Sequence, residues 1–139
     1  MLVIEMETLA NKLRPNKLSD IVGQSHLVGK NKILNNLVKN NKIFNMIFYG
    51  KSGIGKTTIA LALMNELNSN YRLLNATINS KKDFEVVFEE SKMYDDLVLI
   101  VDEIHRMNKD KQDLLLSFIE SGQIILIGLT SSNPYHSIN

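Results

Sequence analysis

The sequence predicts an α/β fold in which helices flank a mainly parallel sheet. Short apolar runs alternate with amphipathic stretches, in the order strand, helix, strand, helix, strand, helix, strand. This alternation is typical of a layered domain whose right-handed crossovers place helices on both faces of the sheet. The chain has 139 residues, of which 44% are hydrophobic, so it has the length and the composition of one ordinary globular domain.

The four predicted strands are apolar runs of the kind that a parallel sheet buries on both faces. They are residues 46–49, 71–76, 97–101 and 124–129. Helical periodicity predicts helices over residues 29–41, 56–67, 81–93 and 109–121. Ser80 stands where a helix N-cap belongs, and Gly122 where a C-cap glycine belongs.

A glycine-rich loop joins the first of these strands to the helix that follows it. Residues 50–57 read Gly-Lys-Ser-Gly-Ile-Gly-Lys-Thr, which is the phosphate-binding pattern G-x-x-x-x-G-K-T. Glycines allow a sharp turn whose N–H groups point at phosphate oxygens, and the new helix adds its positive end. Lys56 brings a charge to the β- and γ-phosphates, and the Thr57 hydroxyl can bind Mg²⁺. The loop therefore predicts nucleotide binding.

Two acids follow the third predicted strand directly. Asp102, at the carboxyl end of a strand near the phosphate loop, is where Mg²⁺ needs a carboxylate, bound directly or through water. Glu103, one residue further, can polarise an attacking water as a general base. The pair favours hydrolysis over phosphorylation of another small molecule. The alternative is two solvated acids at the start of the following helix.

The fourth predicted strand runs into the polar segment Thr130-Ser131-Ser132-Asn133-Pro134. An amide at Asn133 can hydrogen-bond the γ-phosphate or the attacking water. The same residues are equally good turn formers, so spacing alone leaves both interpretations open.

Composition and spacing exclude several classes of function. The absence of cysteine excludes disulfides, thiolate metal sites and a catalytic thiol. The three histidines lack ligand-like spacing, so we expect no metal site made of them. A net charge of +1 provides no basic excess that would indicate nucleic-acid binding by itself. Neither a membrane span nor a signal peptide is visible, and we expect a soluble cytoplasmic protein, with association with the nucleoid left open.

With these motifs placed, the chain resembles the AAA+ ATPases and, within them, the replication-associated recombination protein A family (RarA, also called MgsA). The resemblance runs from about residue 9 to residue 139. It is carried by the segments Lys12-Leu13-Arg14-Pro15, Ile21-Val22-Gly23-Gln24, the phosphate loop, Asp102-Glu103-Ile104-His105-Arg106 and residues 108–134. The Asp-Glu-Ile-His-Arg run is shared with the Holliday-junction branch-migration motor, and the Arg-Pro and Val-Gly-Gln pairs with clamp loaders. The stretch 108–134 separates RarA from both.

The resemblance implies roles for particular residues. Ile21 and Val22 would contact the adenine, Asp102 would bind Mg²⁺, Glu103 would activate water and Asn133 would be the sensor-1 amide. The implied phosphate contacts come from Gly50, Gly53, Ile54, Gly55, Lys56, Thr57 and Thr58. The implied cofactors are ATP or ADP with Mg²⁺.

The implied activity is that of a DNA-dependent ATPase in replication-fork maintenance and recombination. Its implied partners are single-stranded or forked DNA and further copies of itself in a homo-oligomer. A clamp-loader-like ATPase and a branch-migration ATPase remain alternatives. So does a nucleotide-binding module with negligible turnover.

The resemblance also divides the chain into a segment on the adenine side with its helix, residues 1–44, and the α/β core, residues 45–139. Family members continue past the position of Asn139 with a fifth strand, an arginine finger, a helical lid and an oligomerisation region. We therefore expect a truncated domain with little hydrolysis of its own. We also expect strand 46–49 to have a free edge where the fifth strand would pair.

Overall fold

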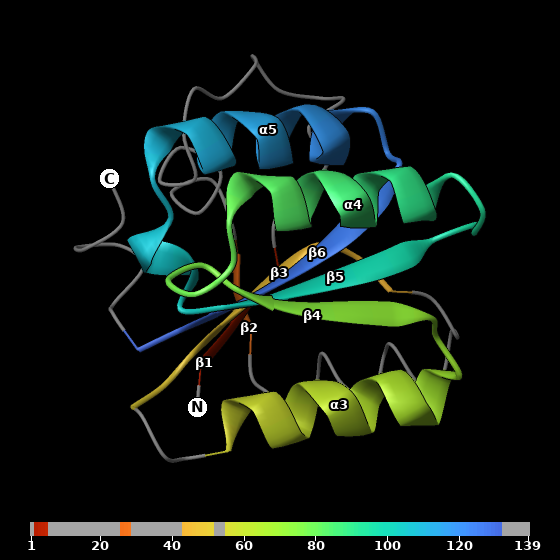
Figure 1. Ribbon diagram of the computed structural model, residues 1–139. Coiled ribbons are helices and arrows are strands. Elements are labelled where there is room, and N and C mark those ends of the chain that lie inside the picture. Colours follow the sequence, from red (N-terminus) through yellow and green to blue (C-terminus); the bar gives the residue numbers. More distant parts are fainter. Residues whose placement is uncertain (1, 6–25, 29–42, 52–54, 132–139) are drawn as a thin grey trace.

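The structure is a computed structural model that describes residues 2–5, 26–28, 43–51 and 55–131. Its centre is a six-stranded sheet in the order β2-β1-β3-β6-β5-β4 (Figure 1). Within the described ranges, no helix is long and apolar enough to cross a membrane.

Four of the strands are parallel and form the core of the sheet. They are β3 (Met46–Tyr49), β4 (Tyr71–Asn75), β5 (Leu97–Asp102) and β6 (Ile124–Thr130). The helical elements between them are α3 (Lys56–Leu67), α4 (Lys81–Ser91), the short 3₁₀ helix η2 (Ile104–Arg106) and α5 (Lys109–Glu120). The predicted α/β fold is therefore confirmed. The observed ends of the four strands and of α3, α4 and α5 lie within two residues of the predicted ones, whereas η2 was not predicted.

Helices cover both faces of the parallel strands. Figure 1 shows α3 on one face and α4 with α5 on the other. Successive side chains of β5 point to opposite faces of the sheet and contribute to the hydrophobic core on each face. Val98 and Ile100 pack in the cluster with α3, whereas Leu97, Leu99 and Val101 pack in the cluster with α4 and α5. All five side chains are fully buried, as expected for a strand covered on both faces.

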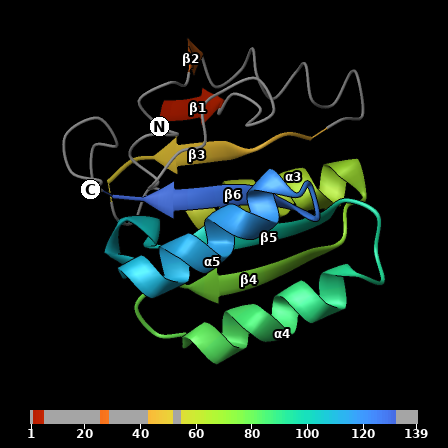
Figure 2. The ribbon, with the colours of Figure 1, turned by 90° about the horizontal axis from the view of Figure 1, so that it is seen from above.

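The edge of β3 is covered by the beginning of the chain, so the expected free edge is wrong. β1 (Leu2–Glu5) pairs antiparallel with β3, and β2 (His26–Val28) pairs antiparallel with β1 (Figure 2). Pairing satisfies the backbone N–H and C=O groups that a free edge would expose. Both strands come from the segment 1–44, where no pattern predicted strands. The predicted helix 29–41 lies outside the described residues.

The helix ends follow local side-chain chemistry. The Ser80 hydroxyl accepts from the Asp83 N–H at 3.4 Å, and the Asp83 carboxylate accepts from the Ser80 N–H at 3.0 Å. This reciprocal capping box starts α4 and confirms the predicted N-cap. Asn108 is the N-cap of α5, and its side-chain oxygen accepts from the Lys111 N–H at 2.9 Å. Gly122 follows α5 with φ +76°, the left-handed conformation that ends many helices, and confirms the predicted C-cap.

Candidate functional site

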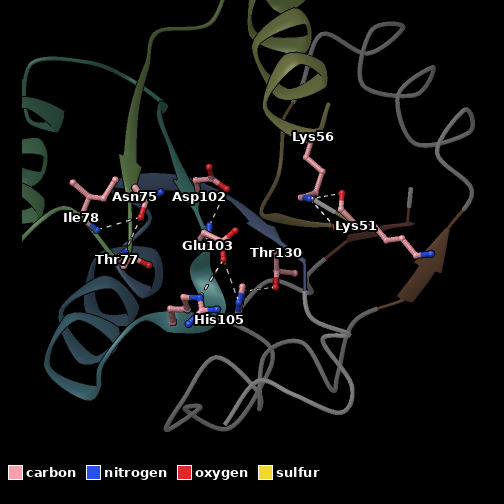
Figure 3. Close-up of polar contacts among 11 residues, drawn as sticks. Lys51, Lys56, Asn75, Thr77, Ile78, Asp102, Glu103, His105 and Thr130 are labelled. Carbon is pink, nitrogen blue, oxygen red and sulfur yellow. Dashed lines mark hydrogen bonds and ion pairs between the residues drawn. The ribbon is translucent and has the colours of Figure 1, made fainter. Parts of the chain in front are cut away.

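The candidate site lies at the carboxyl edge of the parallel strands. β6 is the central strand of this region, since it pairs with β3 on one side and with β5 on the other. The phosphate loop leaves β3, and the acidic pair leaves β5. Figure 3 shows Lys56, Asp102, Glu103 and Thr130 together at this edge. The sheet order therefore places residues from three distant stretches of the chain side by side.

Lys56 is almost completely buried at the start of α3, with 8% of its surface exposed. Its Nζ donates to the carbonyl oxygen of Gly50 at 2.7 Å and to that of Lys51 at 3.0 Å. These carbonyls account for two of the three N–H donors of the ammonium group. They hold the positive charge above the end of β3, where the loop begins.

The first turn of α3 differs from those of α4 and α5. Its N-cap is Gly55, with φ +81°, which has no side chain to accept from the first N–H groups, and the turn contains no acid. By contrast, α4 and α5 each have a side-chain cap and an aspartate in the first turn. Among the described residues, no side chain caps α3. A helix start with unmatched N–H groups and a nearby lysine is suited to bind phosphate.

Thr57 and Thr58 follow Lys56 in this first turn, Thr57 half-buried and Thr58 exposed. Thr57 thus presents a hydroxyl oxygen at the helix start.

The acidic pair is held in a strained turn at the end of β5. Glu103 has φ +54°, a left-handed conformation that is uncommon for a residue with a side chain. The Asp102 carboxylate accepts from the Glu103 N–H at 2.9 Å, which fixes one of its oxygens. Such strain costs on the order of 1 kcal/mol and is concentrated at functional sites.

Neighbouring side chains hold the Glu103 carboxylate in turn. Its Oε2 lies 3.3 Å from Nε2 of His105 and 3.4 Å from Nε of Arg106. The other ring nitrogen of His105 lies 2.7 Å from the Thr130 hydroxyl, at the end of β6. Burial lowers the pKa of the His105 side chain below its ordinary value, although the nearby Glu103 carboxylate opposes this shift.

One continuous series of hydrogen bonds and close polar contacts joins the phosphate loop to the acidic pair. Beyond the contacts above, the Gly50 N–H donates to the Thr130 carbonyl at 3.1 Å. The series consists of Lys56, Gly50, Thr130, His105, Glu103 and Asp102. Lys56 and Asp102 therefore share one edge of the sheet, as the sequence predicted.

The residues at this edge fit a magnesium ion bound with a nucleotide. Mg²⁺ prefers hard oxygen ligands and is usually held by one or two protein groups together with substrate phosphates. Asp102 offers a carboxylate oriented by the Glu103 N–H, and Thr57 offers a hydroxyl. In the parts of the chain that the structure describes, no group of three or more histidine, aspartate or glutamate side chains could hold a metal by itself. The donor set therefore suits a metal that arrives with phosphates.

The roles of all the predicted site residues remain predictions, and five of these residues lie outside the described residues. They are Ile21, Val22, Gly53, Ile54 and Asn133.

The structure adds His105 and Thr130 to the residues that meet at this edge, and neither was predicted as a site residue. In the sequence, His105 belongs to the Asp-Glu-Ile-His-Arg run that carries the resemblance, and Thr130 begins the polar segment after the fourth predicted strand.

Comparison with known proteins identifies the family of P-loop domains to which the chain belongs. The chain matches the family described as "Holliday junction DNA helicase RuvB P-loop domain" over residues 13–138. The chain therefore belongs to this family of P-loop domains. The solved structure titled Thermotoga maritima RuvB Holliday junction branch migration motor is 26% identical, with a TM-score of 0.60. The likeness covers 90% of this chain and 46% of that one.

The chain is also similar to proteins named replication-associated recombination protein A, with higher sequence identity than to the RuvB structure. Replication-associated recombination protein A of Bacillus subtilis (strain 168) is 51% identical over 134 residues, which cover 96% of this chain and 32% of that protein. The protein of the same name from Escherichia coli (strain K12) is 33% identical over 137 residues, 96% of this chain and 31% of that protein. The predicted resemblance to the RarA family of AAA+ ATPases is therefore confirmed. The chain spans about a third of the length of these relatives.

Proposed function

We infer that this domain binds ATP with Mg²⁺ at the carboxyl edge of its sheet and hydrolyses it as part of a DNA-dependent ATPase. The observation that carries this inference is the juxtaposition of two features. One is the uncapped start of α3 with the buried Lys56 ammonium. The other is the acidic pair of β5, joined to that lysine through β6.

Each residue has a distinct task in the proposed reaction. The first-turn N–H groups of α3 and the Lys56 ammonium bind the phosphates and offset the negative charge that develops on them. Thr57 and Asp102 would hold Mg²⁺, which when bound neutralises charge on the β- and γ-phosphates. Glu103 orients the attacking water and accepts its proton. By resemblance, Asn133 contacts the γ-phosphate or that water, and Ile21 and Val22 contact the adenine.

The proposed biological role is replication-fork maintenance and recombination. The names of the RarA relatives support it, together with identity that extends through nearly the whole chain. Single-stranded or forked DNA would be the partner, and copies of the full-length protein would assemble into an oligomer. With this role we propose a cytoplasmic location, which is where bacterial DNA lies.

Branch migration of Holliday junctions is a second candidate function. The matched family description and the likeness to the Thermotoga maritima motor favour it. DNA stimulation of ATP hydrolysis by the full-length protein separates the two candidates. Stronger stimulation by forked or single-stranded DNA than by four-way junctions supports the RarA role, and the reverse supports branch migration.

Nucleotide binding is tested with Lys56→Ala and the matched control Lys51→Ala. Both remove a lysine from the same loop, but the Lys51 side chain is exposed and contributes only its backbone carbonyl to the contacts described. A ligand present at 100 times its Kd stabilises a protein by about 2.7 kcal/mol. Mg-ADP should therefore raise the melting temperature of the wild type and of Lys51→Ala, but not that of Lys56→Ala. Equal stabilisation of all three proteins would contradict the proposed phosphate site.

Hydrolysis is tested with Glu103→Gln in the full-length protein. Glutamine keeps the size of the side chain but cannot accept the proton of the attacking water. We expect ATP binding to persist and the hydrolysis rate to fall by about 100-fold or more. Wild-type turnover in this variant would remove Glu103 from the role of general base.

A further inference from the structure

Glu103, His105 and Thr130 form a connected group in which no sequence motif assigns a role to His105 or Thr130. His105 Nε2 lies 3.3 Å from Glu103 Oε2, and His105 Nδ1 lies 2.7 Å from Thr130 Oγ1. Thr130 is fully buried, and the His105 side chain is 10% exposed. Figure 3 shows the imidazole between the end of β6 and the turn that carries Glu103. The ring therefore bridges the strand next to the phosphate loop and the acidic turn.

We propose that His105 is a positioning residue that couples the end of β6 to the Glu103 carboxylate, so that β6 sets the direction in which this carboxylate points. The proposal rests on the proposed function, in which Glu103 activates water. It adds a means by which the strand leading to Asn133 controls that activation. In this role His105 touches neither nucleotide nor metal.

The chemistry of the three groups determines where the protons lie. A carboxylate has no proton to give, so the 3.3 Å contact between His105 Nε2 and Glu103 Oε2 is favourable only when Nε2 carries a hydrogen. In a neutral imidazole the other nitrogen is then an acceptor, and the Thr130 hydroxyl donates to Nδ1. Burial of the ring, which lowers the pKa of His105, agrees with this neutral form. The group therefore has one consistent direction, from Thr130 through His105 to Glu103.

Packing holds the bridge in place. Ile104 lies between Glu103 and His105 in the chain, and its side chain is fully buried in the core. Its side chain lies so close to Gly128 of β6 that a Cβ added to this glycine would be 2.8 Å from Ile104 Cδ1. A displacement of β6 towards η2 would therefore press on Ile104. Arg106, the second contact of Glu103, is 64% exposed, and an exposed ion pair positions a carboxylate weakly.

The backbone connects the same group to the phosphate loop. The Thr130 carbonyl accepts from the Gly50 N–H, and the Gly50 carbonyl accepts from Lys56 Nζ. A phosphate that attracts the Lys56 ammonium thus acts on Gly50, whose N–H donates to the Thr130 carbonyl. This gives the bridge a direct connection to the nucleotide that it would respond to.

The first test determines which ring nitrogen of His105 carries a hydrogen, and it does not depend on ATP hydrolysis. Nitrogen-15 correlation spectra of the histidine rings at neutral pH report which ring nitrogen carries hydrogen, and the signals of His105 are assigned by their loss in His105→Gln. We expect a protonated Nε2 and an unprotonated, hydrogen-bonded Nδ1. Thr130→Val, which has the same shape without the hydroxyl, should shift Nδ1, whereas Thr130→Ser should not. A protonated Nδ1, or no response to Thr130→Val, would overturn the proposal.

The second test measures ATP hydrolysis by the full-length protein. His105→Phe and Thr130→Val should lower kcat by about 10- to 100-fold, because misplacing a reacting group by about 1 Å costs that much, and leave KM within about twofold. His105→Gln keeps a donor near the position of Nε2 and Thr130→Ser keeps the hydroxyl, so both should recover most of kcat. The double variant His105→Phe/Thr130→Val should be no slower than His105→Phe alone, because both changes break one connection.

The outcomes separate this proposal from the proposed function. If the wild type does not hydrolyse ATP, or Glu103→Gln is fully active, the proposed function fails, and the spectra alone decide whether the bridge exists. If Glu103→Gln is inactive but His105→Phe and Thr130→Val keep full kcat, the bridge fails while the proposed function stands. Losses that multiply in the double variant, or that appear only in KM, would likewise contradict the bridge.

Discussion

Replacing Gly128 by alanine would test how closely β6 packs against β3 and η2. Gly128 pairs with Ile47 on one side and with Val101 on the other. A Cβ at this position would lie 2.6 Å from Ile47 Cδ1 and 2.8 Å from Ile104 Cδ1, closer than real Cβ contacts come. Both isoleucines are fully buried, so neither side chain can move into solvent. The added methyl group must therefore displace β6, β3 or η2.

The expected cost follows from this crowding. Adding one carbon to a well-packed core costs about 1–3 kcal/mol in the free energy of unfolding. At about 4 °C per kcal/mol for a domain of this size, the melting temperature should fall by about 4–12 °C. Because the displaced turn carries Glu103 and His105, hydrolysis by the full-length protein should fall as well.

A double-variant cycle in urea denaturation separates crowding from other causes. Ile47→Val removes the Cδ1 atom that lies nearest to the new methyl group, and by itself should cost about 0.5–1.5 kcal/mol. The double variant Gly128→Ala/Ile47→Val should lose less than the sum of the two single losses by about 0.5 kcal/mol or more. Strictly additive losses, or a Gly128→Ala protein as stable as the wild type, would refute the packing argument.

Three further predictions concern stability. Ser80→Ala removes the capping hydroxyl of α4 and should cost about 1 kcal/mol in urea denaturation, while Ser80→Thr should cost much less. Gly122→Ala meets open space but must adopt φ +76°, so it should cost about 1 kcal/mol, and Gly122→Asn should recover part of this because asparagine tolerates that conformation. Burial lowers the pKa of His105, so the unfolded chain takes up this proton first as the pH falls. The free energy of unfolding should therefore fall as the pH drops through about 6.5 and level off below the folded-state pKa, and His105→Gln should remove this part of the pH dependence.

Much of the fold could be predicted because its local signals are strong. The parallel strands are apolar runs that a sheet covered on both faces requires, and β5 is buried along the whole predicted run. The capping box at Ser80 and the left-handed Gly122 depend on neighbours within four residues, so sequence patterns contain them. β1 and β2 escaped prediction because they are four and three residues long and gain their stability from pairing with distant strands.

The candidate site likewise has features that the sequence predicts and features that it does not. The phosphate loop and the acidic pair are recognisable from spacing, since their chemistry depends on residues that are adjacent in the chain. The contact between His105 and Thr130 is not recognisable in this way, because Thr130 lies 25 residues beyond His105 and meets it through the packing of η2 against β6. The left-handed backbone of Glu103 was equally invisible, since glutamate has no preference for it.

Local chemistry alone thus determines that this chain alternates strands and helices, carries a phosphate-loop pattern at one helix start and carries two acids at a strand end. Only the tertiary arrangement decides that β6 separates β3 from β5, that the first residues of the chain cover the edge of β3, and that His105 joins Thr130 to Glu103. The physical reason is that turns and caps are governed by interactions within a few residues, whereas strand order and side-chain bridges depend on how distant segments share one buried core.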